Sequence, residues 1–156
     1  MADSQTCEIL NRLLVVVYRS LPMYFADVPP WSAPGSERAF ETLSEIVREQ
    51  KSLSQRVANF ILDRHCRVEM GEYPMEFTGL HDCALDYLIG RMIAYQKRDI
   101  RLIERCVEEL GPDARAKALA DEALGAARGH LESLEELVAK PSLSVHNPSP
   151  EPVSSA

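Results

Sequence analysis

The chain has 156 residues, of which 46% are apolar and 26% are charged, so a single domain can bury a hydrophobic core without internal repeats or a disulfide scaffold. These values exclude a disordered chain and a small disulfide-stabilised protein. The formal net charge of -7 and the isoelectric point near 5.1 argue against a nucleic-acid-binding or anionic-membrane surface, because like charges repel.

The cysteines and the apolar runs predict the compartment. The four cysteines lie far apart, without the CxxC spacing of zinc or redox motifs, at Cys7, Cys66, Cys83 and Cys106. We expect four reduced, mostly structural thiols. The longest apolar run, residues 13–18, is far too short to span a membrane, and the first residues lack the basic region of an export signal. The sequence thus predicts a cytoplasmic protein with no membrane partner and no nucleic-acid partner.

Helical patterns begin near the N-terminus, and no segment shows the alternation of a strand. The first pattern covers residues 4–25, with apolar residues three and four positions apart. Pro22 predicts a kink or an early end near Leu21, because proline removes an amide donor. A second helix is expected to run from an N-cap at Ser36 to about Arg64.

Two more helical patterns follow. The third helix is expected to begin at a Thr78 cap and to end at Gly111. The fourth covers residues 113–138 and contains Gly125 and Gly129. We expect these two glycines to let a neighbouring backbone approach closely.

Four helices of this length, each with one apolar stripe, predict an all-α four-helix bundle. The connection of about eleven residues between the second and third helices reaches about 36 Å, which is about the length of a 24-residue helix. It therefore allows either an overhand crossover along the bundle or an up-down-up-down arrangement. We expect the bundle domain to cover residues 1–140, and the Pro- and Ser-rich residues 141–156 to form a disordered tail.

Three polar residues fall on or beside the apolar stripes, namely Glu49, Gln96 and His130. Burying a polar side chain costs free energy unless a hydrogen bond or a ligand compensates, so all three are candidate metal ligands. Each also has a structural interpretation: a solvated or ion-paired Glu49, a hydrogen-bonded core amide at Gln96 and a packed imidazole at His130. Zinc and iron sites use three or four ligands, so this set alone forms an incomplete cage.

The chain resembles a known family in its helix order and in short sequence patterns. The first helix carries Leu10-Asn11 and, thirteen residues later, Tyr24-Phe25; the fourth carries Gly129-His130-Leu131 followed by Leu134-Glu135. Over residues 8–138 these patterns resemble the ferritin-like superfamily, and bacterioferritin in particular. The resemblance implies a crossover between the second and third helices and a carboxylate di-iron site between the helices.

That site takes one Glu from each of two helices and a Glu-x-x-His pair from each of the other two. Carried over to this chain, the first-helix Glu falls on Val17, the second-helix pair on Glu49 and Ser52, the third-helix Glu on Gln96, and the last pair on Ala127 and His130. Only Glu49 and His130 keep a metal-binding side chain. Because the carboxylates that would neutralise two irons are missing, the resemblance implies a degenerate di-iron site without ferroxidase chemistry.

The first hypothesis for function is therefore a non-catalytic ferritin-like protein, a structural or protein-interaction module that is not an enzyme and holds no cofactor. The apolar run of the first helix is longer than one bundle face requires, which leaves Val15, Val16 or Tyr18 to contact something outside the bundle. A homodimer through the first two helices would cover them.

Two alternative hypotheses for the function retain a bound metal ion. In one, a remnant mononuclear site with Glu49, His130 and Gln96 as ligands holds a single iron, manganese or zinc ion for storage, sensing or redox work. In the other, a zinc ion is bound by His65, Cys66, His81 and Cys83. The zinc site requires the up-down-up-down arrangement, because a crossover separates the end of the second helix from the start of the third by about 35 Å.

Two further features have mainly structural interpretations. Basic residues on the third helix are interleaved with acidic ones, Asp99 among them, which is typical of a solvated helical face. Trp31 lies in a Pro-rich break, where it either forms an exposed contact or anchors its own loop to the end of the bundle.

Overall fold

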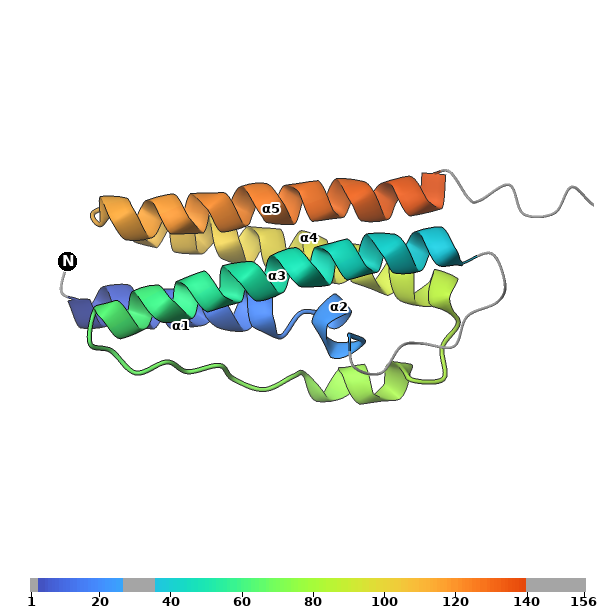
Figure 1. Ribbon diagram of the computed structural model, residues 1–156, viewed down its shortest axis with the longest axis horizontal. Coiled ribbons are helices and arrows are strands. Elements are labelled where there is room, and N and C mark those ends of the chain that lie inside the picture. Colours follow the sequence, from blue (N-terminus) through green and yellow to red (C-terminus); the bar gives the residue numbers. More distant parts are fainter. Residues whose placement is uncertain (1–2, 27–35, 140–156) are drawn as a thin grey trace, which may run out of the picture.

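The computed structural model describes residues 3–26 and 36–139, and within these residues it contains helices and no strand. The elements in chain order are α1 (Asp3–Tyr18), α2 (Leu21–Tyr24), α3 (Glu37–Asp63), the 3-10 helix η1 (Met75–Leu80), α4 (Leu85–Glu109) and α5 (Ala114–Ala139). The long helices α1, α3, α4 and α5 pack side by side, and the short α2 lies beyond the end of α1 (Figure 1). The predicted all-α class is confirmed for the described residues.

The break expected near Leu21 is present, and it begins just after Tyr18. Ser20 is the N-cap of α2, and its hydroxyl accepts a hydrogen bond of 3.3 Å from the amide of Met23. Pro22 lies in the first turn of α2, where a backbone N–H has no acceptor within the helix, so the lack of this N–H in proline costs no hydrogen bond. Proline thus starts a new short helix here instead of bending a long one.

The boundaries of α3 agree with the prediction, and the start of α4 does not. Ser36 is the N-cap residue of α3, although its hydroxyl accepts no capping hydrogen bond, and the helix ends at Asp63. Thr78 does not cap α4, because it lies inside η1 and its hydroxyl donates to the carbonyl of Met75. The helix α4 begins only at Leu85, with Ala84 as its N-cap residue, so Thr78 lies too far along the chain to cap it.

The connection between α3 and α4 runs the length of the bundle (Figure 1). Side-chain contacts follow it in order along α1 and α2: Cys66 is bonded to Cys7, Asn11 binds the backbone of Arg67 and Glu69, Arg19 donates to the carbonyls of Met70 and Gly71, and Tyr73 packs on Tyr24. Consequently α3 and α4 point in the same direction, whereas an up-down-up-down arrangement would make them antiparallel.

This connection also accounts for the long apolar run of α1. Val15 packs against Gly71, whose φ of 61° suits glycine and where a Cβ would lie 2.9 Å from a Val15 methyl group. Val16 packs on the core, and the guanidinium of Arg19 covers the ring of Tyr18 at 4.6 Å from its centroid. These side chains are covered within the chain, so the apolar run does not require a partner, and the homodimer stays a prediction.

The expectation for the two glycines of α5 is wrong. Gly125 and Gly129 are both exposed, and a Cβ at either position would meet nothing within 4 Å outside its own helix. Neither glycine therefore serves a close backbone contact in the described part of the chain.

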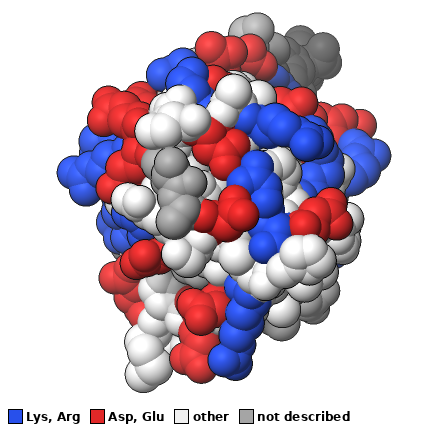
Figure 2. All heavy atoms as spheres, turned by 90° about the vertical axis from the view of Figure 1, so that its left-hand side faces the viewer, with Lys and Arg blue, Asp and Glu red and all other residues white. Residues whose placement is uncertain are grey.

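The surface carries charges of both signs. Figure 2 shows the end of the bundle where α1 begins, with acidic and basic side chains mixed over the visible face. The ion pairs of the described residues include Arg64 with Asp113 and Arg12 with Glu109. None of the described helices has the length and hydropathy needed to cross a membrane. The predictions for Trp31 and for the tail of residues 141–156 lie outside the described residues.

Candidate functional site

A small cavity lies between the four long helices, at the level along the bundle where two of the candidate metal ligands, Gln96 and His130, are found. Its volume is about 10 Å³, which is close to the space that a single water molecule needs. The residues of interest that line it are Val17 of α1, Gln50 and Leu53 of α3, Gln96 and Asp99 of α4, and Ala127 and His130 of α5. The cavity thus brings together two of the three predicted polar residues, Gln96 and His130.

Gln96 links α4 to α5. It is only 3% exposed, and its side-chain amide donates a hydrogen bond of 2.9 Å to the backbone carbonyl of Ala127. A buried amide with a partner of this kind is stable in a core without any ligand. The contact agrees with the structural interpretation of Gln96.

His130 links α5 to α3. Its side chain is 7% exposed, and its Nε2 lies 2.5 Å from Oε2 of Glu49, whose side chain is 61% exposed. Glu49 does not line the cavity, so the pair meets at the edge of the bundle rather than at its centre. The contact occupies Nε2 of the ring, so a metal ion at that nitrogen would have to displace the carboxylate from its present position.

Asp99 is a buried carboxylate that the sequence interpretation placed on a solvated face, and this was wrong. It is 7% exposed and lines the cavity, and its ion-pair partner is the neighbouring Arg98 at 3.6 Å. Burial raises the pKa of Asp99 to about 6, against the opposing effect of Arg98. Its spacing could have revealed it, because it lies three residues after Gln96 and four before Ile103, on the same stripe.

Gln50 is another buried polar residue that lines the cavity and that was not among the predicted site residues. It is 5% exposed, and its side-chain oxygen accepts a hydrogen bond of 2.7 Å from the hydroxyl of Ser20. This bond joins α3 to the cap of α2. Ser52, where the resemblance placed the missing histidine, is exposed, whereas Leu53 lines the cavity.

The predicted zinc ligands do not come together. Cys66 is bonded to Cys7, so its thiolate is not available. His65 lies just after α3, while His81 and Cys83 lie beyond η1, at the opposite end of the crossover (Figure 1). The described residues include no group of three His, Cys, Asp or Glu side chains that could hold a metal ion. The prediction failed because it depended on an up-down-up-down arrangement.

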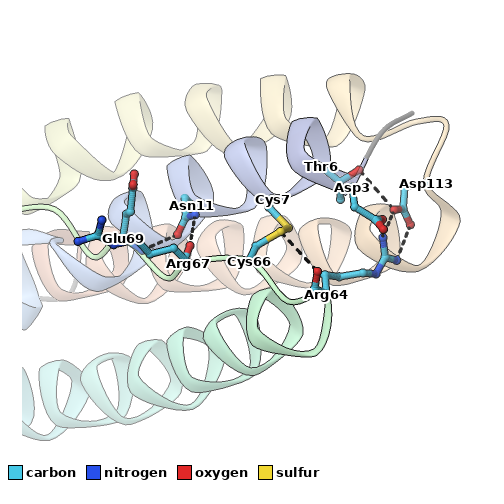
Figure 3. The surroundings of a disulfide bond; sticks show 9 residues. All are labelled: Asp3, Thr6, Cys7, Asn11, Arg64, Cys66, Arg67, Glu69 and Asp113. Carbon is cyan, nitrogen blue, oxygen red and sulfur yellow. Dashed lines mark hydrogen bonds and ion pairs between the residues drawn. A yellow bond between two sulfur atoms is a disulfide. The ribbon is translucent and has the colours of Figure 1, made fainter.

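The prediction of four reduced thiols is wrong for two of them. Cys7 of α1 and Cys66, three residues after α3, form a disulfide bond with their Cα atoms 6.4 Å apart (Figure 3). The other two cysteines, Cys83 and Cys106, are free. Burial raises the pKa of the Cys106 thiol, which keeps it protonated and unreactive.

A charged cluster supports the disulfide at the start of the crossover (Figure 3). Arg64 donates hydrogen bonds of 2.9 Å to Asp3 and 2.8 Å to Asp113, and Asp113 also accepts from the hydroxyl of Thr6 at 3.4 Å and the amide of Ala116 at 3.2 Å. The guanidinium lowers the pKa of Asp113. The first residues of α1 and α5 are thereby tied to the end of α3.

The chain matches no protein-family model, no curated protein and no solved structure. The fold and the cavity define an all-α bundle with a polar cluster in its core and a disulfide at one end of a long connection.

Proposed function

We propose that this protein is a ferritin-like bundle in which a hydrogen-bonded polar cluster has replaced the di-iron centre, and that it acts as a non-catalytic structural or protein-interaction module. The observation that carries this proposal is the central cavity, because all four long helices contribute to it, and α1, α4 and α5 do so at the positions that the family resemblance assigns to ligands. The crossover between the parallel helices α3 and α4 supports the same relationship.

On α3, the two ligand positions of the family fit the structure better when each is moved one residue toward the C-terminus. Gln50 and Leu53 have the spacing of a Glu-x-x-His pair and both line the cavity, whereas Glu49 and Ser52 are exposed. The six ligand positions are then Val17, Gln50, Leu53, Gln96, Ala127 and His130. Of these, only His130 carries a side chain that commonly binds iron.

The replacements change the electrostatics of the core. Val17, Leu53 and Ala127 are apolar, and a glutamine keeps the shape of a glutamate without its charge. Asp99 is the one carboxylate among the residues that line the cavity. Two divalent ions would bring four positive charges into a site of low dielectric constant, and a single carboxylate leaves most of that charge uncompensated. This favours a core built for stability over one built for metal chemistry.

Oxidation of Fe²⁺ in air provides the functional test. Purified protein, with an equal concentration of a ferroxidase as the positive control, is mixed with Fe²⁺ and the rise of Fe³⁺ absorbance is followed. We expect the rate to equal that of buffer with serum albumin. A rate that scales with the concentration of this protein and falls on His130→Ala would contradict the proposal.

The homodimer through the first two helices belongs to the same proposal and is tested by the mass in solution. A cytoplasmic location also stays a prediction. It was inferred from reduced thiols and from first residues that lack the basic region of an export signal. Disulfide bonds persist mainly in oxidising compartments, so the bond between Cys7 and Cys66 is evidence against the first of these grounds.

A mononuclear metal site is the second candidate function, and the approach of His130 to Glu49 favours it. Their 2.5 Å contact places a ring nitrogen of α5 beside a carboxylate oxygen of α3, which supports this candidate. A tetrahedral ion about 2.0–2.1 Å from both atoms would hold them about 3.4 Å apart, so metal binding must open this contact. Stoichiometric iron, manganese or zinc that is lost on His130→Ala would support this candidate over the first.

A further inference from the structure

A second cavity, much larger than the central one, opens at the surface between α2 and the first half of α3. Its volume is about 410 Å³, within the range of about 300–1,000 Å³ that is typical of sites for small molecules. Its apolar wall is formed by Pro22, Phe25, Phe40, Leu43, Val47 and Met92. None of these residues lines the central cavity, so an inference about this site does not depend on the proposed function.

One edge of this cavity is polar and basic. Ser44, Arg48 and Lys51 line it from α3, and their spacing of four and three residues places them on one face of the helix. Arg48 and Lys51 are exposed and form no ion pair with any other described residue. The acidic Glu49 lies next to them in sequence, but it turns away to His130 and does not line the cavity.

An apolar wall and two cations that pair with none of the described residues favour the same kind of ligand. Hydrocarbon buried on the wall gains free energy in proportion to its area, and a carboxylate at the edge gains charge-assisted hydrogen bonds. We propose that this cavity binds a small amphipathic carboxylate with a single hydrocarbon chain, its carboxylate between Arg48 and Lys51 and its chain against Phe25, Leu43 and Met92. In a protein of net charge -7, two local cations direct such an anion to this edge.

Displacement of a fluorescent fatty acid by octanoate, decanoate and dodecanoate tests the proposal, with circular dichroism to confirm that the protein stays folded. We expect saturable displacement, with an affinity that rises about fourfold for each added methylene group. We also expect 1-dodecanol to bind at least about tenfold more weakly than dodecanoate, because it lacks the charge that pairs with the two cations. The absence of saturable displacement, or equal affinities for dodecanoate and 1-dodecanol, would overturn the proposal.

Variants that remove positive charge distinguish binding in this cavity from a general attraction of anions to the protein surface. We expect Arg48→Gln with Lys51→Gln to weaken dodecanoate about tenfold or more and to leave 1-dodecanol unchanged. The matched control is Arg101→Gln with Arg105→Gln, which removes the same charge from exposed positions on α4 and should leave both affinities unchanged. Equal losses in the two double variants would overturn the proposal. Val47→Trp, which fills the cavity from its wall, should weaken both ligands.

Discussion

The disulfide between Cys7 and Cys66 gives the largest stability effect that can be worked out from this structure. The bond closes a loop between residues 59 positions apart in the sequence. The loop-closure entropy that it removes from the unfolded chain is about 14 cal/mol/K, which is about 4 kcal/mol at 25 °C. The contacts of Arg64 and Asn11 hold the same end of the crossover without the bond, so the reduced protein should still fold.

The assay is urea unfolding followed by circular dichroism, with and without a reducing agent. With a denaturant dependence of about 2 kcal/mol per M, reduction should lower the midpoint by about 2 M. Cys7→Ala with Cys66→Ala should lower it similarly and make it insensitive to reductant. Cys83→Ala, at a partly buried free cysteine, should keep the full response and serves as the control. Equal midpoints with and without reductant, or four titratable thiols in the untreated protein, would refute the reasoning.

Three smaller effects follow from the core and from α5. Because burial raises the pKa of Asp99 to about 6, the folded state binds its proton more tightly than the unfolded state, so the contribution of Asp99 to stability is greatest below about pH 4 and falls by about 3 kcal/mol as the pH rises through 6. Asp99→Asn should remove this part of the pH dependence and raise the free energy of unfolding at pH 7. Gly125→Ala and Gly129→Ala should each raise the free energy of unfolding by about 0.5–1 kcal/mol, because both positions are exposed inside a helix and meet no neighbour. Gln96→Ala should lower it by about 2 kcal/mol through the lost hydrogen bond to Ala127 and the space left behind, and Gln96→Leu by less than half as much.

Each of these outcomes can fail in a recognisable way in urea or thermal unfolding. A wild-type stability that does not fall between pH 4 and pH 6 relative to Asp99→Asn would contradict the buried state of that carboxylate. A loss of stability on Gly129→Ala would mean that the position contacts something outside the described residues. Equal losses for Gln96→Ala and Gln96→Leu would place the whole effect of Gln96 in its hydrogen bond.

The helices were predictable because their signals are local. The apolar stripe of α3 fixes its extent, and the position of Pro22 fixes the break before α2. The start of α4 was predicted too early, because Thr78 has the chemistry of a cap but lies inside the separate 3-10 helix η1. The path of the connection depends on contacts with α1 and α2 that are far away in sequence, and no local pattern reports them.

The site was predictable where a polar residue interrupts a stripe, as at Gln96 and His130. Asp99 was assigned to a charged face because its neighbours in sequence are charged, although its spacing placed it with Gln96. Glu49 was singled out as a polar residue beside the stripe of the second helix, yet the neighbouring Gln50 is the residue that faces the core. The disulfide between Cys7 and Cys66 could not be predicted from the sequence. The spacing of cysteines identifies short motifs, but it does not identify partners that are 59 residues apart.

The central claim is that the core of this bundle does not hold a pair of irons. Its most direct test is elemental analysis of protein produced in medium supplemented with iron, manganese and zinc and purified without chelator, with the amount of each metal measured per chain. The account predicts no stoichiometric metal. Two equivalents of iron per chain, removed by a chelator and restored by added Fe²⁺, would contradict it.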